Sequence, residues 1–169
     1  MLEKLEKDIE AELYTIPESK KPDKNFLTIL ERIREQDQEE AVMLIESIMQ
    51  GINNRKNRFY LITLYDKLGD LIGRNMLFLI DEANTALDLF FQSGDVRIGF
   101  WLLKRVLPSG DSRTLAILDH FIHLYKDRSV VARLKGCRNR LAHRVAAVHK
   151  RIESSDFKPM LTDYMEWQE

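Results

Sequence analysis

The chain has little of what disulfide-bonded, loop-rich or membrane-spanning proteins need. It contains seven glycines, four prolines and a single cysteine, Cys137, among 169 residues. One cysteine cannot form an internal disulfide, and no apolar run reaches the about 18 residues that a membrane-spanning helix requires. These absences favour a cytoplasmic protein that is not inserted in a membrane.

Residues that form helices well are abundant instead. Leucine, glutamate, lysine, arginine, isoleucine and methionine are common, and 44% of the side chains are hydrophobic, which is enough for a sizeable core. The composition therefore predicts an all-α protein folded as a helical bundle. We expect a short, charged helical arm over residues 1–22 and one domain over residues 23–169.

Turn residues divide the predicted domain into helical segments. Asp23 or Asn25 is expected to cap its first helix, and the polar run 35–40 is either a turn or the solvated face of a helix. The apolar residues of 58–92 are predicted to form much of the core. No repeat period is evident along the chain.

Two turn clusters rich in Ser, Gly and Asp separate the later helices. They are expected to precede short helices over 96–107 and 112–126. A final long helix is predicted over 129–153, and a short tail helix that contains Tyr164 and Trp167 is predicted to follow it.

The charges are distributed unevenly, although the formal net charge is only −1. Residues 1–46 carry 13 acidic and 7 basic side chains, whereas residues 126–151 carry 9 basic side chains and a single acidic one, Asp127. The basic stretch coincides with the final long helix. It is the only strongly basic stretch of the chain.

The final helix has two distinct faces when its residues are placed at about 100° per residue. An apolar stripe, which should face the core, consists of Leu134, Cys137, Leu141, Val145, Val148 and Ile152. The opposite face consists mostly of small or polar residues, namely Ala132, Gly136, Asn139, His143, Ala146 and Lys150. Because small residues permit close backbone approach, we expect another chain or a ligand to come near this face.

The string Arg138-Asn139-Arg140-Leu141-Ala142-His143 lies within this helix. It resembles the motif of the HEPN superfamily, in which an arginine followed by Asn, Asp or His precedes a histidine by four to six residues. The resemblance implies a helical bundle that dimerises with the motif helices of two subunits facing one another. It also implies RNA binding and, as in many members, metal-independent RNA cleavage in a toxin–antitoxin or defence system.

The resemblance implies roles for particular residues, and no metal or other cofactor. Arg138, Asn139 and His143 would be catalytic. Lys135, Arg140 and Arg144 would bind the RNA backbone, and Ala132, Gly136 and Ala146 would lie at the dimer interface. No upstream acidic partner of the motif can be assigned, and we give no role to Asp81 or Glu82.

These side-chain types suit the implied chemistry. Cleavage of RNA by its own 2′-hydroxyl needs a base, an acid and donors that stabilise charge on the phosphate. An imidazole exchanges protons near neutral pH, and a guanidinium can hold a phosphate through two parallel hydrogen bonds. The amide of Asn139 could orient the imidazole or donate to the phosphate.

A second interpretation needs no catalysis. Asn139 and His143 could bridge a helix interface, while Arg138 pairs with a carboxylate of the acidic N-terminal half. The chain would then be a noncatalytic interaction or regulatory protein, similar in kind to the mannitol-repressor family. Its partner would be another protein, whereas a toxin would have a cognate antitoxin as its partner. Asp119, His120 and His123 have a spacing compatible with a metal, but two histidines on an amphipathic helix are more often surface residues, so we predict no metal site.

Overall fold

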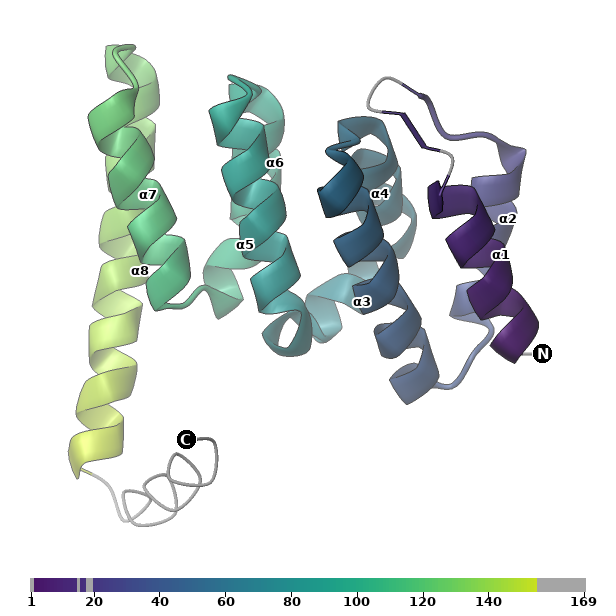
Figure 1. The fold of residues 1–169 in the computed structure, drawn as a ribbon. Coiled ribbons are helices and arrows are strands. Elements are labelled where there is room, and N and C mark those ends of the chain that lie inside the picture. The colour runs from purple at the N-terminus through teal and green to yellow at the C-terminus, as the bar shows by residue number, and fades with distance from the viewer. Residues whose placement is uncertain (1, 15, 18–19, 155–169) are drawn as a thin grey trace. The chain divides into compact units, whose positions relative to one another are not determined.

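The structure is all-α, as predicted from the composition. The computed structural model describes residues 2–14, 16–17 and 20–154, and it describes side chains in these ranges as far as residue 147. The regular elements in these ranges are helices (Figure 1). They are α1 (Leu2–Tyr14), α2 (Lys24–Arg34), α3 (Gln38–Arg55), α4 (Arg58–Arg74), α5 (Met76–Gln92), α6 (Val96–Val106), the short 3-10 helix η1 (Leu107–Ser109), α7 (Ser112–Leu124) and α8 (Arg128–Ser154).

The chain forms two compact units, residues 1–109 and residues 110–169. Unit 1 contains α1 to α6 and η1, and unit 2 contains α7 and α8. A boundary at this position was not predicted from the sequence. The predicted tail helix with Tyr164 and Trp167 lies outside the described residues.

Unit 1 is built from three helical hairpins, α1 with α2, α3 with α4, and α5 with α6. Figure 1 shows them side by side, and contacts join α1 to α3, α3 to α5 and α2 to α4. Each hairpin thus packs on the next through equivalent helices, as in helical-repeat proteins.

The hairpins of both units follow each other at a nearly constant distance along the chain. Their first helices begin at Leu2, Gln38, Met76 and Ser112, which are 36 to 38 residues apart. This regularity concerns the lengths of helices and turns and not the residue types, and we did not detect it in the sequence.

Helix ends follow the capping residues. Asp23, not Asn25, caps α2, because its carboxylate accepts a hydrogen bond from the Phe26 N–H at 3.2 Å. The polar run 35–40 contains a turn, since α2 ends at Arg34 and α3 begins at Gln38. The charged side chains of this run are therefore divided between a turn and the first turn of α3.

The segment predicted to be an N-terminal arm packs on the rest of unit 1. Leu5 and Ile9 are buried, and α1 contacts both α2 and α3. Leu13 of α1 packs directly on Gly51 of α3, where an added Cβ would lie 2.5 Å from Cδ1 of Leu13 and would displace that side chain. The apolar positions of α1 are thus part of the core, although most of its other residues are charged.

The buried side chain of Asn57 holds the connection between α1 and α2. Its Nδ2 donates to the carbonyl oxygens of Pro17 at 2.8 Å and Lys20 at 2.9 Å. Its Oδ1 accepts from the Tyr60 N–H and so caps α4. One side chain therefore fixes both the start of α4 and the segment that precedes α2.

We predicted that the apolar residues of 58–92 form much of the core, and this is confirmed for part of them. Leu64, Leu79, Leu87 and Phe90 are at most 1% exposed, whereas Phe59 is only half-buried. These buried residues lie in α4 and α5. Within the described part of the chain, no helix is both long enough and apolar enough to cross a membrane.

Candidate functional site on the last helix

The α7–α8 hairpin positions the residues of the predicted motif. Three residues, 125–127, separate its helices, and Asp127 precedes the first residue of α8. The Asp127 carboxylate accepts hydrogen bonds from the hydroxyl of Ser129 and from the N–H groups of Ser129 and Val130. These bonds lower the pKa of Asp127, with the Ser129 hydroxyl contributing most. Asp127 thus caps α8 as an anion.

The apolar stripe of α8 faces the interior of unit 2, as predicted. Leu134 is 0% exposed, Cys137 is 7% exposed and Leu141 is 2% exposed. Val145 is half-buried. The side chains of Val148 and Ile152 lie outside the described residues. The stripe fixes the rotation of α8 about its own axis and hence the direction of its other faces.

Gly110 lets α8 come close to the turn before α7. A Cβ at this position would lie 2.8 Å from Cδ1 of Leu141. The carbonyl oxygen of Gly110 accepts a hydrogen bond from Nη2 of Arg144 at 2.8 Å. The guanidinium of Arg144, which we predicted to bind RNA, therefore contributes to the contact within unit 2.

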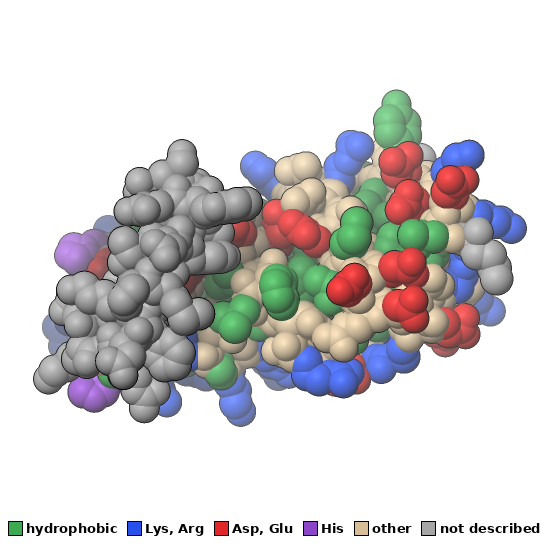
Figure 2. Space-filling model, turned by 90° about the horizontal axis from the view of Figure 1, so that it is seen from below, with side chains coloured by type: hydrophobic (Ala, Val, Ile, Leu, Met, Phe, Trp, Pro, Cys, Tyr) green, Lys and Arg blue, Asp and Glu red, His purple; other side chains and the backbone are tan. Residues whose placement is uncertain are grey.

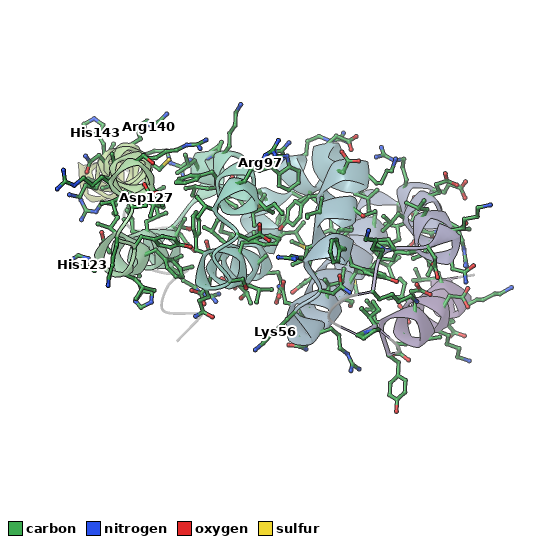
Figure 3. All side chains as sticks on the ribbon, turned by 90° about the horizontal axis from the view of Figure 1, so that it is seen from above. Lys56, Arg97, His123, Asp127, Arg140 and His143 are labelled. Atoms are coloured by element: carbon green, nitrogen blue, oxygen red, sulfur yellow. The ribbon has the colours of Figure 1, made fainter. Side chains whose placement is uncertain are left out.

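The predicted polar face of α8 is exposed. Asn139 and His143 lie one helical turn apart, and neither side chain forms a hydrogen bond or ion pair with another described residue. Figure 3 shows His143 and Arg140 on the side of α8 that points away from α7. The small residues predicted for a dimer interface are exposed on the same helix, and they are Ala132, Gly136 and Ala146. No described atom would lie within 4 Å of a Cβ at Gly136.

At roughly 100° per residue, Arg138 lies about 120° from the middle of the Asn139–His143 face, next to the core stripe, and its side chain is held by α7. Its Nε donates to Oδ1 of Asp119 at 2.8 Å, and the two side chains are 41% and 45% exposed. The partner is a carboxylate, but it comes from α7 and not from the acidic N-terminal half that we considered. Within the described residues, the two terminal nitrogens of Arg138 have no hydrogen-bond partner. Those nitrogens carry N–H donors that remain accessible to a phosphate.

The surroundings of the motif are basic. The described side chains of unit 2 include eight lysines and arginines and three aspartates. Lys135 and Arg140 are exposed. About the helix axis they lie on opposite flanks of the Asn139–His143 face, at roughly 100° per residue. A negatively charged strand lying across this face would therefore meet a cation on either side.

His123 of α7 does not point into this arrangement, as Figure 3 shows. Nδ1 of His123 lies 2.8 Å from the backbone oxygen of Asp119, one turn earlier in the same helix. The carboxylate of Asp119 binds Arg138. Among the described residues, no three or more His, Cys, Asp or Glu side chains are grouped as a metal site would need.

The chain matches no protein-family model, and no curated protein or solved structure is significantly similar to it. The relation to the HEPN superfamily therefore stays a prediction that depends on the α8 motif.

The sequence did not identify Asp119 as the partner of Arg138; we weighed it there only with His120 and His123 as a metal ligand. It lies 19 positions before Arg138. The turn residues between α7 and α8 predict a hairpin and so indicate that the two helices contact one another. They do not indicate which of the acidic residues faces the arginine, because that depends on the rotation of both helices.

Proposed function

We propose that unit 2 binds RNA through the exposed side of α8, and that Arg138, Asn139 and His143 form one half of a metal-independent ribonuclease site. A second copy of the chain supplies the other half. In this proposal, the protein acts as a toxin or as a component of a defence system.

One observation carries the proposal. Asn139 and His143 are exposed one turn apart on the face of α8 opposite its core stripe, and both are free of hydrogen bonds to described residues. Within the described residues, neither side chain therefore contributes a hydrogen bond to the fold. Here both are available to a ligand, between the exposed cations Lys135 and Arg140.

The cleavage step uses only groups of the protein and the RNA. His143 takes the proton of the ribose 2′-hydroxyl, and the 2′-oxygen forms a bond to the adjacent phosphorus. The bond from phosphorus to the 5′-oxygen breaks, and this oxygen takes a proton from an imidazolium. The products are a 2′,3′-cyclic phosphate and a 5′-hydroxyl. Arg138 and Asn139 donate hydrogen bonds to the phosphate oxygens as their negative charge grows.

A second copy completes this chemistry. In a single concerted step, one imidazole cannot both remove the proton of the 2′-hydroxyl and protonate the leaving 5′-oxygen. The exposed glycine and alanines beside His143 would let two α8 helices approach closely. A two-fold axis across this face brings the histidines of both copies to the same phosphate.

The experiment compares purified wild-type protein with Arg138→Ala and His143→Ala in an RNA cleavage assay that contains EDTA. We expect the wild type to cleave RNA and each variant to be slower by about 10²- to 10⁴-fold, the usual effect of removing an acid–base group. Product ends are analysed for the cyclic phosphate.

Two exposed residues of the same types serve as controls. His123→Ala on α7 and Arg97→Ala on α6 remove an exposed histidine and an exposed arginine from other helices, and Figure 3 labels both residues. Both variants should cleave RNA at the wild-type rate. Cleavage that survives in both Arg138→Ala and His143→Ala, or that disappears in EDTA, would show that the site does not carry this activity.

A noncatalytic function is favoured by a different observation, the ion pair of Arg138 with Asp119. The pair gives the arginine a structural role within the α7–α8 hairpin, and that role requires no substrate. In that case the Asn139–His143 face would bind a protein partner. Wild-type protein that has no ribonuclease activity would support this second function.

A further inference from the structure

A groove lies between α1 and α3 in unit 1, far along the sequence from the α8 motif. Its volume is about 350 Å³. Apolar side chains form its centre, and these include Ile9 and Leu13 of α1 and Met43 and Leu44 of α3. Three carboxylates also line it, those of Glu6, Glu10 and Glu40. We refer to it as the acidic groove.

The apolar side chains of the acidic groove range from buried to exposed. Ile9 and Leu44 are each 4% exposed and form the floor, whereas Met43 is 65% exposed at the edge. Methionine is flexible and polarisable, and it is common on surfaces that accept varied apolar partners. Among residues 2–147, Met43 is one of few large hydrophobic side chains with this degree of exposure.

The charged side chains that line the groove are all acidic. No lysine or arginine lines it. On α1, Lys4 and Lys7 lie on other faces of the helix. Arg55 is at the far end of α3, where its guanidinium lies 5.8 Å from the centre of the Tyr14 ring. Figure 2 shows Asp and Glu side chains surrounding hydrophobic ones on the part of the surface formed by α1 and α3.

We propose that the acidic groove binds a basic amphipathic helix of a partner protein. The lining residues of α1 run from Leu2 to Leu13. This length corresponds to about 16 Å at roughly 1.5 Å per residue, so the bound helix has about three turns. Its apolar residues, at spacings of three and four, lie on the exposed Met43 and on the half-buried Leu2 and Leu13. Its lysines or arginines pair with Glu6, Glu10 and Glu40.

Charge complementarity selects this occupant over others. Carboxylates on both walls repel nucleic acid and acidic peptides. An extended peptide usually binds by adding to the edge of a sheet, and α1 and α3 offer no such edge. A helix lying along two parallel walls buries its apolar side and keeps its cations at the carboxylate rim.

The test uses the full chain and three synthetic helical peptides in a fluorescence anisotropy titration. The first peptide carries leucines along one face and lysines on the others. The second has glutamate in place of each lysine, and the third has the composition of the first in a scrambled order without an apolar face. We expect the first to bind at least about tenfold more tightly than either of the others, with an affinity that falls as salt is added.

Charge reversal in the groove identifies the site. Glu6→Lys combined with Glu10→Lys should weaken binding of the lysine peptide by about tenfold or more and should strengthen binding of the glutamate peptide. The matched control is Glu35→Lys combined with Asp66→Lys, which makes the same change of net charge at exposed positions outside the groove. This control should bind the lysine peptide nearly as well as the wild type. All four carboxylates are exposed, so circular dichroism should show a wild-type fold.

Three results would overturn the proposal. If both double variants weakened binding of the lysine peptide equally, only the net charge of the protein would matter. Equal binding of the scrambled peptide would mean that no apolar face is recognised. Self-association of the wild type that Glu6→Lys with Glu10→Lys abolishes would mean that a second copy of the chain occupies the groove.

Discussion

The guanidinium of Arg138 on α8 and the carboxylate of Asp119 on α7 are joined through a single nitrogen, with Nε 2.8 Å from Oδ1. A contact through Nε orients the plane of the guanidinium and leaves the terminal nitrogens facing outward. Both side chains are more than a third exposed, at 41% and 45%. Such a pair stabilises a fold little, but it can determine where an arginine points.

We therefore predict that Asp119 positions Arg138 for the proposed cleavage. Asp119→Ala should lower the free energy of unfolding by less than about 1 kcal/mol, as expected for an exposed ion pair. It should lower the rate of RNA cleavage by roughly ten- to a hundredfold, because the phosphate-binding group loses its orientation. Urea denaturation and the EDTA cleavage assay measure the two effects.

The double variant separates positioning from an independent role. If Asp119 acts only through Arg138, then Arg138→Ala with Asp119→Ala should cleave no more slowly than Arg138→Ala alone. A further loss in the double variant, or a large loss of stability in Asp119→Ala, would contradict this assignment.

Replacing Gly136 with alanine should have opposite effects on the stability of the isolated chain and on dimerisation. No described atom lies within 4 Å of a Cβ at this position, so Gly136→Ala should raise the stability of the isolated chain by about 1 kcal/mol, the usual helical cost of glycine. If two α8 helices meet at this face, the added methyl should weaken the dimer. Light scattering at micromolar concentrations and denaturation at low concentration measure the two effects.

Gly73 of α4 is the matched control, since it is also exposed and has nothing within 4 Å of a Cβ. Gly73→Ala should leave the molecular mass unchanged. A wild-type chain that is monomeric throughout the concentration range would remove the dimer from the proposed function.

The local features of this fold could be read from the sequence. The spacing of Leu134, Cys137 and Leu141 predicts the buried face of α8, because a helix repeats every 3.6 residues. Asp23 and Asn25 both predict a helix start near α2, because their side-chain oxygens can accept the free N–H groups of a first turn, and the structure shows Asp23 in this role. Both inferences involve residues within a few positions of each other.

The contacts that we did not predict join residues far apart in the chain. Asp119 meets Arg138 across a hairpin, and Leu13 of α1 packs against Gly51 of α3. Because most residues of α1 are charged, we predicted an arm. The apolar positions of α1 do not indicate from the sequence that α2 and α3 cover them. Such contacts depend on how helices rotate and pack, which composition and spacing do not determine.

The cap of α8 should make its stability depend on pH. Hydrogen bonds from Ser129 and Val130 hold the pKa of Asp127 below its ordinary value of 3.8. A lowered pKa in the folded state means that the anion stabilises α8 above this value, and that the stabilisation is lost as the pH falls through the folded pKa. We expect the thermal midpoint of the wild type to fall faster in acid than that of Asp127→Asn, which keeps a capping oxygen but does not titrate.

Circular dichroism melts from neutral pH to below 3.8 make this comparison. Asp23 and Asp70 also have lowered pKa values and are present in both proteins, so only the difference between the two curves reports on Asp127. A difference in midpoint that does not change with pH would contradict the prediction.

Asn57 should be among the most sensitive positions of unit 1. Its fully buried side chain binds two carbonyl oxygens, those of Pro17 and Lys20, and caps α4 through the Tyr60 N–H. Asn57→Ala removes the cap and leaves buried polar groups unpaired, so it should lower the free energy of unfolding by about 2 to 4 kcal/mol. The exposed Asn54 is the control, since Asn54→Ala should change stability by less than about 0.5 kcal/mol.

Asn57→Asp separates the two roles of this side chain. Aspartate keeps an oxygen for the Tyr60 N–H, but it has no N–H to donate and places a negative charge beside the carbonyl oxygens of Pro17 and Lys20. Urea denaturation should therefore find Asn57→Asp at least as unstable as Asn57→Ala, because retaining the cap does not offset a buried, repelled carboxylate. Wild-type stability in Asn57→Asp would show that the cap alone matters and that the bonds to the segment before α2 contribute nothing.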